Sequence, residues 1–302
     1  MKMTKIALLA SAMMMGNMAV AQAAPVKIAV LMYGNKAEFV QLMERYGKEH
    51  PAVKSGDAVL TFYDGRYDAS VQNDQAATAI QTRADAIIVN PMDFEANDEL
   101  GGYLEAKAVL DKLQCKTKKV NVVIIEGPKG GSGEIQRGKG NDKAIAECGP
   151  GQVTVLERKT ANWSRAEAQP LMENWLQKHR GKINGVIGQN DEMALGAIEA
   201  IKGAGLNVKD FAIAGVDGVS DAIHAVQAGE MVSILQDAKG QMQGAIDVAM
   251  RAAKGDSYQP QSDIWKQYAK DLNWNGGTSK HYYIPWTVVT PENAQQLLDA
   301  RK

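Results

Sequence analysis

The chain has 302 residues, of which 45% are hydrophobic and 23% are charged, and its formal net charge is −1. This composition is typical of a globular protein with enough apolar residues for a buried core, and the length allows two domains. The sequence contains no basic tract, which argues against a nucleic-acid-binding protein.

The first 23 residues have the pattern of a secretory signal peptide. A basic start, MKMTK, precedes the apolar run IALLASAMMMGNMAV, and Ala21 and Ala23 place small residues before a cleavage site at Ala24. The apolar run is short for a membrane span, and no lipobox cysteine accompanies it. We therefore expect residues 1–23 to be removed and the mature protein to be exported.

Strand patterns alternate with amphipathic helix patterns along the rest of the chain. Strands are expected at residues 26–34, 57–65, 84–91, 120–127, 152–158, 183–189, 211–218 and 231–236, with a last one before Pro291. Helices are expected at residues 38–50, 70–83, 100–113, 166–179, 192–202, 221–230 and 240–255, after the glycine-rich loop, and at the end of the chain. The alternation predicts an α/β fold whose sheets are parallel and connected by right-handed crossovers.

The glycine-rich segment EGPKGGSGEIQRGKG lies between a strand and a helix, where a phosphate-binding loop would be. Read from Gly133 it gives GxxxxGK, but Gly140 stands where a phosphate loop needs serine or threonine, and Gln136 breaks the dinucleotide pattern. No cofactor is therefore predicted. Two interpretations remain, a flexible turn or a turn whose small residues let the backbone approach a ligand.

The sequence offers no set of metal ligands or catalytic residues. The histidines lack metal-ligand spacing, and we expect them to be solvated. Ser132 lacks the second glycine of a nucleophile elbow. The histidines are His50, His179, His224 and His281.

Polar and aromatic side chains follow several of the predicted strands. Each alone is better explained as a cap or loop residue, and one of Asn190 and Asp191 can cap the next helix while the other faces a cleft. Together they would lie on the carboxyl edge of one sheet, where α/β proteins bind ligands. Their amide, carboxylate and guanidinium groups match the donors and acceptors of sugar hydroxyls. The candidates are Arg137, Trp163, Asn190, Asp217 and Gln236.

Several stretches give the chain a close resemblance to the ribose/galactose-type periplasmic sugar-binding proteins of ABC importers. These stretches are DAIIVNPMD, NDEMALGAIEAIK, GVDGVSDAI and VAMRAAKG, with EGPKGGSGEIQRG and NWSRAEA. The resemblance implies two Rossmann-like lobes joined by a hinge and closing on one ligand. It places the N-lobe at residues 24–96 and 238–283, and the C-lobe at residues 97–237 and 284–302.

The resemblance also implies a function and a set of site residues. It predicts a monomeric periplasmic protein that binds a monosaccharide or polyol, with a membrane permease as partner and a chemoreceptor as a further possible one. The five candidates above fall on ligand-contact positions. In the N-lobe Asn35 and Phe39 match the first ligand loop, whereas Glu38 replaces an aromatic residue, so that Glu38 and Lys36 become further candidates.

Cys115 and Cys148 are the two cysteines of the chain. Each follows a predicted C-lobe helix and precedes a strand, which places both at the end of the sheet away from the cleft. Because export leads to an oxidising compartment, we expect a disulfide between them.

The resemblance implies that a segment is missing near residues 96–97. After NPMDFEA the family continues with a helix and a strand that carries ligand-binding residues, whereas here Ala96 runs directly into the helix that begins near Asn97. A strand–helix–strand unit takes about 30 residues. We therefore expect a shortened N-lobe and ligand binding that is weakened or lost.

Two other classes of protein compete with this interpretation. A sugar-responsive repressor would carry a DNA-binding motif where this chain carries its export signal. A sugar-modifying enzyme would need a catalytic group in the cleft, for which Asp217 is the isolated candidate.

Overall fold

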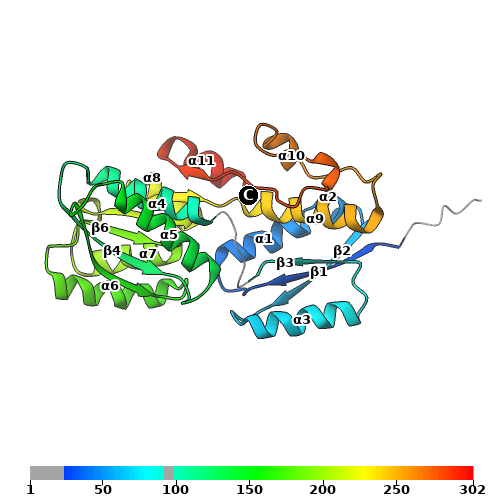
Figure 1. The fold of residues 1–302 in the computed structure, drawn as a ribbon, viewed down its shortest axis with the longest axis horizontal. Coiled ribbons are helices and arrows are strands. Elements are labelled where there is room, and N and C mark those ends of the chain that lie inside the picture. Colours follow the sequence, from blue (N-terminus) through cyan, green and yellow to red (C-terminus); the bar gives the residue numbers. More distant parts are fainter. Residues whose placement is uncertain (1–23, 92–97, 302) are drawn as a thin grey trace, which may run out of the picture.

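The computed structural model describes residues 24–91 and 98–301. The predicted signal peptide and the junction at residues 96–97 lie outside the described residues. Figure 1 shows two lobes side by side, with α10 and α11 along one side of the pair. None of the helices in the described ranges is long and apolar enough to cross a membrane.

The smaller lobe is built on a three-stranded parallel sheet in the order β2-β1-β3. One face packs against α1 and α9, which bring Phe39, Met43, Met242 and Met250 to the core of β1, and α3 packs on the other face. The chain segments of this lobe are β1 (Val26–Met32), α1 (Glu38–Lys48), α2 (Pro51–Lys54), β2 (Ala58–Asp64), α3 (Ala69–Gln81), β3 (Ala86–Val89), α9 (Ala238–Lys254), α10 (Ile264–Gln267) and η2 (Asn275–Gly277).

The larger lobe is built on a six-stranded sheet in the order β5-β4-β6-β7-β8-β9. Its strands are parallel except for β9, which pairs antiparallel with β8. The chain segments are α4 (Asp98–Lys112), β4 (Val120–Glu126), α5 (Ser132–Ala146), β5 (Val153–Thr160), α6 (Arg165–His179), β6 (Gly185–Gly188), α7 (Asp191–Gly203), η1 (Val208–Asp210), β7 (Ala212–Asp217), α8 (Ser220–Gln227), β8 (Val232–Leu235), β9 (Thr287–Val289) and α11 (Pro291–Asp299).

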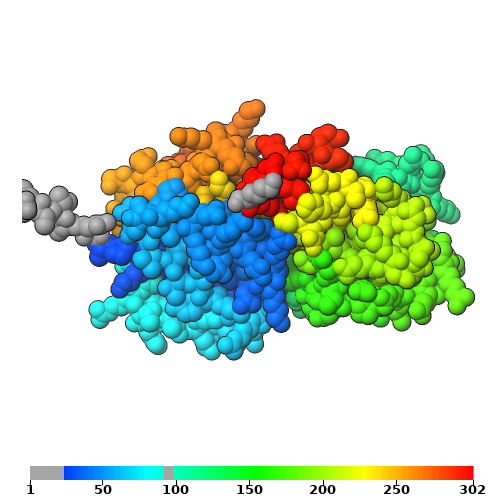
Figure 2. All heavy atoms as spheres, turned by 180° about the vertical axis from the view of Figure 1, so that it is seen from behind, coloured from blue at the N-terminus to red at the C-terminus, as the bar shows by residue number. Residues whose placement is uncertain are grey.

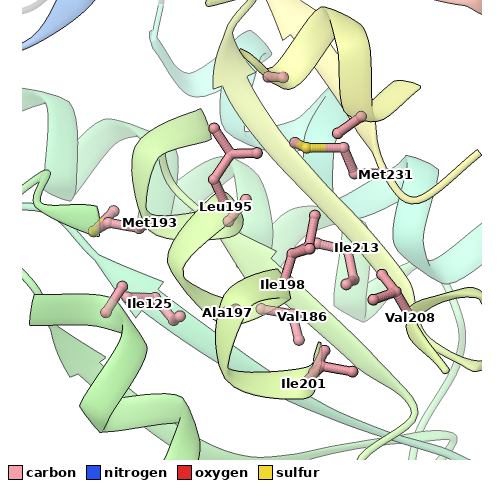
Figure 3. Packing of buried hydrophobic residues seen from close by; sticks show 14 of the residues in the cluster. Ile125, Val186, Met193, Leu195, Ala197, Ile198, Ile201, Val208, Ile213 and Met231 are labelled. Atoms are coloured by element: carbon pink, nitrogen blue, oxygen red, sulfur yellow. The ribbon is translucent and has the colours of Figure 1, made fainter. Parts of the chain in front are cut away.

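Helices cover both faces of the larger sheet, which explains its continuous apolar strands. On one face α6, α7 and α8 enclose Ile125, Val186 and Ile213 with Met193 and Ile198 (Figure 3). On the other face α4 and α5 cover a second cluster around β4 and β6. The α/β fold with parallel-rich sheets is confirmed, whereas the lobe boundaries and the shortening of the N-lobe stay predictions.

The structure joins Cys115 and Cys148 by a disulfide with a Cα–Cα distance of 5.5 Å. Both side chains are buried in the cluster beneath α4 and α5. The bond ties the end of α4 to the end of α5, at the opposite end of these helices from Asp98 and Ser132.

The expectation of solvated histidines is wrong for His50. Its side chain is fully buried, its Nδ1 accepts a hydrogen bond from the backbone N–H of Ala52, and its Nε2 lies 3.2 Å from a carboxylate oxygen of Asp247. The pattern before Pro51 indicates a helix end, but α9 packs over that end from a distant part of the sequence.

Candidate ligand-binding site

A cavity of about 800 Å³ lies between the two lobes. Tyr33, Phe39 and Met43 line it from the N-lobe, and the glycine-rich loop with a group of polar and aromatic side chains lines it from the C-lobe. A further wall, formed by β3, α9 and the segment before β9, is largely apolar. The loop residues are Gly131, Ser132 and Gly133, and the polar and aromatic C-lobe side chains include Asp98, Arg137, Trp163, Asn190, Asp217 and Gln236.

The carboxyl ends of the parallel strands bring the C-lobe residues together. Asn190 follows β6, Asp217 ends β7, and Gln236 follows β8, while Trp163 lies in the loop between β5 and α6. Arg137 reaches the same place from α5. All five residues predicted from the C-lobe sequence thus line one cavity. Their role as ligand contacts stays a prediction.

Arg137 is the centre of this group. Its Nε donates to Asp98 Oδ1 at 3.0 Å, and its Nη2 donates to Gln236 Oε1 at 3.3 Å. Its Nη1 donates to the backbone oxygen of Gln189 and lies 3.6 Å from Asp217 Oδ1. Burial alone would lower the pKa of Arg137, but the carboxylates of Asp98 and Asp217 raise it above its ordinary value.

Two glycines let α4 and α5 cross closely enough to place Arg137. A Cβ atom on Gly102 would come within 2.2 Å of the Arg137 backbone oxygen. A Cβ atom on Gly140 would come within 2.1 Å of the Glu99 backbone oxygen. The pairing of Asp98 with Arg137 therefore depends on small residues at this crossing.

The glycine-rich loop makes room for a side chain. A Cβ atom on Gly127 would come within 2.0 Å of the Trp163 ring, so glycine is required where the indole packs. The ring in turn lies 5.4 Å from the Arg137 guanidinium, an arrangement in which a cation is attracted to the aromatic face. Trp163 thus makes a close approach to the backbone of this loop, while Gly131 and Gly133 line the cavity, and the approach of a ligand to them stays a prediction.

Asn190 and Asp191 have different roles. Asn190 Oδ1 caps α7 by accepting from the Met193 N–H at 2.9 Å, and the same residue lines the cavity. Asp191 turns inward, where its carboxylate accepts from Ser233 Oγ at 2.8 Å and from the Val219 N–H at 2.9 Å. Burial raises the pKa of Asp191 to about 7, although these hydrogen bonds oppose the rise.

Asp217 holds a backbone conformation that side chains rarely adopt. Its φ angle is +122°, and such strain persists only where the surrounding structure enforces it, often at a functional site. Burial raises the pKa of Asp217 well above its ordinary value, and the charge of Arg137 opposes this shift.

Of the two residues predicted from the N-lobe, Asn35 and Phe39, the structure places one in the lining of the cavity. Phe39 lines the cavity, but Asn35 and Lys36 are exposed on the loop before α1 and lie outside the lining. Tyr33, which directly follows β1, lines the cavity instead, and its ring meets Tyr67 edge-on at 5.5 Å. Burial and the nearby Asp217 raise the pKa of Tyr33.

Comparison with known proteins gives one family match and several relatives. A family model described as a periplasmic binding protein domain matches residues 94–257. The xylitol-binding protein of Mycolicibacterium smegmatis is 32% identical over an alignment of 237 residues, and the match covers 67% of this chain and 66% of that protein. The putative rhizopine-binding protein of Rhizobium meliloti is 29% identical over an alignment of 287 residues, and the match covers 82% of this chain and 85% of that protein.

Solved structures agree with these matches. A solute-binding protein of an ABC transporter from Bacillus halodurans, with bound myo-inositol, is 28% identical with a TM-score of 0.75, over 92% of this chain and 99% of that one. A periplasmic solute-binding protein of an ABC transporter from Actinobacillus succinogenes, with bound D-allose, is 27% identical with a TM-score of 0.72. The match covers 90% of this chain and 99% of that one.

Proposed function

Because the chain belongs to the family of periplasmic binding protein domains, we propose that it is the exported solute-binding component of an ABC importer. Its ligand is a monosaccharide or polyol, held in the cavity between the lobes. The observation that carries this proposal is the convergence of Arg137, Trp163, Asn190, Asp217 and Gln236 on one cavity. The relatives described above are named as binding proteins, which argues against an enzyme.

The chemistry of the cavity supports a neutral ligand with many hydroxyl groups. Carboxylate, amide and guanidinium groups provide both acceptors and donors, and the Trp163 ring offers a flat apolar surface for the C–H side of a sugar. By the same proposal the protein is periplasmic and monomeric, delivers its ligand to a membrane permease, and needs no cofactor or metal.

A thermal-shift screen of the mature protein tests the proposal. Ribose, xylitol, myo-inositol and D-allose are suitable first probes, because a ligand that binds only the native state raises the melting temperature. A reversible shift without product formation supports a binding protein. Conversion of the probe would instead indicate an enzyme, and no shift with a broad set of sugars and polyols would contradict sugar binding.

We expect Asn190 and Asp217 to contact the bound sugar directly. Asn190→Ser keeps an oxygen that can cap α7, and Asp217→Asn keeps a side chain that tolerates a positive φ angle. Losing a hydrogen bond to the ligand should weaken binding by about 1–3 kcal/mol in each variant. Calorimetry with the sugar found in the screen measures this, and unchanged affinity in both folded variants would exclude the assignment.

The proposal includes a shortened N-lobe. The alignments with the two relatives support this part of the proposal, because their lengths of 237 and 287 positions exceed the shares of this 302-residue chain that they cover, 67% and 82%. The three-stranded sheet and exposed apolar residues of this lobe, Val59, Ile80 and Val89, also support a missing unit. If binding is weak or absent, the chain is a homologue impaired by this loss.

Hydrogen exchange should then differ between the lobes. We expect amides of β4, β6 and β7 to be more strongly protected than those of β1, β2 and β3, because the three-stranded sheet has two open edges and a smaller core. Exchange followed by mass spectrometry on peptides from each lobe measures the difference. Equal strong protection, together with tight sugar binding, would show that the N-lobe is not weakened.

A further inference from the structure

Glu38 connects the two lobes outside the ligand cavity. It is the first residue of α1 in the N-lobe, and Ser220 is the first residue of α8 in the C-lobe. The Glu38 carboxylate accepts hydrogen bonds from the Ser220 backbone N–H at 3.1 Å and from the Ser220 hydroxyl at 2.7 Å. Neither residue lines the cavity, although the position of Glu38 in the sequence led us to consider it as a ligand contact.

Arg301 completes the contact from the C-lobe side. Its guanidinium donates to the Gly218 backbone oxygen and, at 3.3 Å, to the Ser220 hydroxyl, and lies 3.7 Å from Glu38 Oε1. In Figure 2 the red C-terminal segment lies where the blue N-terminal part meets the yellow part that includes α8.

The surroundings of Glu38 favour a carboxylate at this point. The N-terminus of α8 carries partial positive charge and N–H groups that have no acceptor within the helix, and Arg301 adds a full positive charge. The side chains of Glu38 and Arg301 are only 29% and 12% exposed, so their attraction is less screened than that of a fully exposed pair.

We propose that Glu38, Ser220 and Arg301 form an interlobe latch that holds the lobes closed in the absence of ligand and so positions the binding residues of both lobes. The latch consists of protein groups only, so that it can form without a ligand. Its effect on affinity rests on the proposed function: a ligand that needs the closed form binds more tightly when more of the free protein is already closed.

Small-angle X-ray scattering of the ligand-free protein tests the latch without any knowledge of the ligand. We expect Glu38→Ala and Arg301→Met each to raise the radius of gyration, and high salt to shift the wild-type protein in the same direction. Glu44→Ala is the matched control, because Glu44 lies on the same helix but pairs with Lys48 at the surface, and this variant should scatter like the wild type. For a sugar found in the screen, removing the charged hydrogen bonds should weaken binding by about tenfold.

Two results would overturn the proposal. One is a folded Glu38→Ala variant whose scattering equals that of the wild type. The other, decisive if Glu38→Ala does not fold, is an Arg301→Met variant with unchanged scattering. A failed sugar screen leaves the scattering result intact, so the latch and the proposed function are tested separately.

Discussion

Replacing Arg137 by methionine is expected to weaken ligand binding by at least about 100-fold and to lower the free energy of unfolding by about 3–5 kcal/mol. Both effects come from the central position of the guanidinium. It is buried between the carboxylates of Asp98 and Asp217, and it also donates to Gln189 and Gln236.

The loss of stability follows from the charges that would remain. Asp98 and Asp217 are themselves buried, and an uncompensated buried carboxylate costs far more than an exposed one. Methionine fills part of the space of the arginine stem but replaces none of its donors. Lys139→Met is the matched control, because Lys139 is an exposed cation on the same helix, α5, and its loss should change neither stability nor binding appreciably.

Chemical denaturation and calorimetry with a sugar found by the thermal-shift screen separate the two effects. A stable Arg137→Met variant that binds within tenfold of the wild type would show that Arg137 is a peripheral group. Loss of binding with unchanged stability would mean that Asp98 and Asp217 find other partners, and would contradict the stability part of the prediction.

Much of the C-lobe part of the cavity could be predicted, because one rule places Trp163, Asn190, Asp217 and Gln236. Strand and helix patterns locate the carboxyl ends of the strands, and residues directly after those ends meet at one edge. The same rule applies to Tyr33 after β1. We missed it because the resemblance directed attention to Asn35, which the loop before α1 leaves exposed.

Other features depend on contacts that local patterns do not contain. Asp98 reaches Arg137 because α4 and α5 cross at Gly102 and Gly140, and no spacing in the sequence announces that crossing. The pattern also could not tell which of Asn190 and Asp191 faces the cavity. That choice depends on Ser233 of β8, which is distant in the sequence and whose hydroxyl donates a hydrogen bond to the inward-turned Asp191 at the start of α7.

Asp247 shows the same limit on prediction. It lies on α9 and is fully buried, and its carboxylate gathers donors from a segment that follows it by 11 to 18 residues. Tyr258 Oη and Trp265 Nε1 each donate to it at 2.7 Å, and the Gln261 backbone N–H donates at 2.8 Å. His50 Nε2 lies 3.2 Å from the same carboxylate. The Asp247 side chain therefore connects the segment of residues 258–265 with α9 and with the end of α1.

Replacing Asp247 by alanine is therefore expected to lower the free energy of unfolding by about 3–5 kcal/mol, since several buried donors would lose their common acceptor at once. Asp263→Ala is the control, because Asp263 is a surface residue paired with Lys239, and such pairs contribute about 0–1 kcal/mol. Denaturant unfolding measures both variants. Equal stability of Asp247→Ala and Asp263→Ala would show that water replaces the carboxylate at no cost.

The dependence of stability on pH gives an independent measurement of the same network. Burial alone would raise the pKa of Asp247, but His50, Ser262, Gln261 and Trp265 lower it from 3.8 to about 2. Because the pKa is lower in the folded than in the unfolded state, the contribution to stability is complete above pH 3.8 and is lost as the pH falls through about 2. The wild type should thus lose about 2 kcal/mol more than Asp247→Asn over this range, because a tenfold change in proton affinity between the two states corresponds to about 1.4 kcal/mol. Parallel acid-unfolding curves for the two proteins would mean that the Asp247 carboxylate is not stabilised by its donors in the folded state.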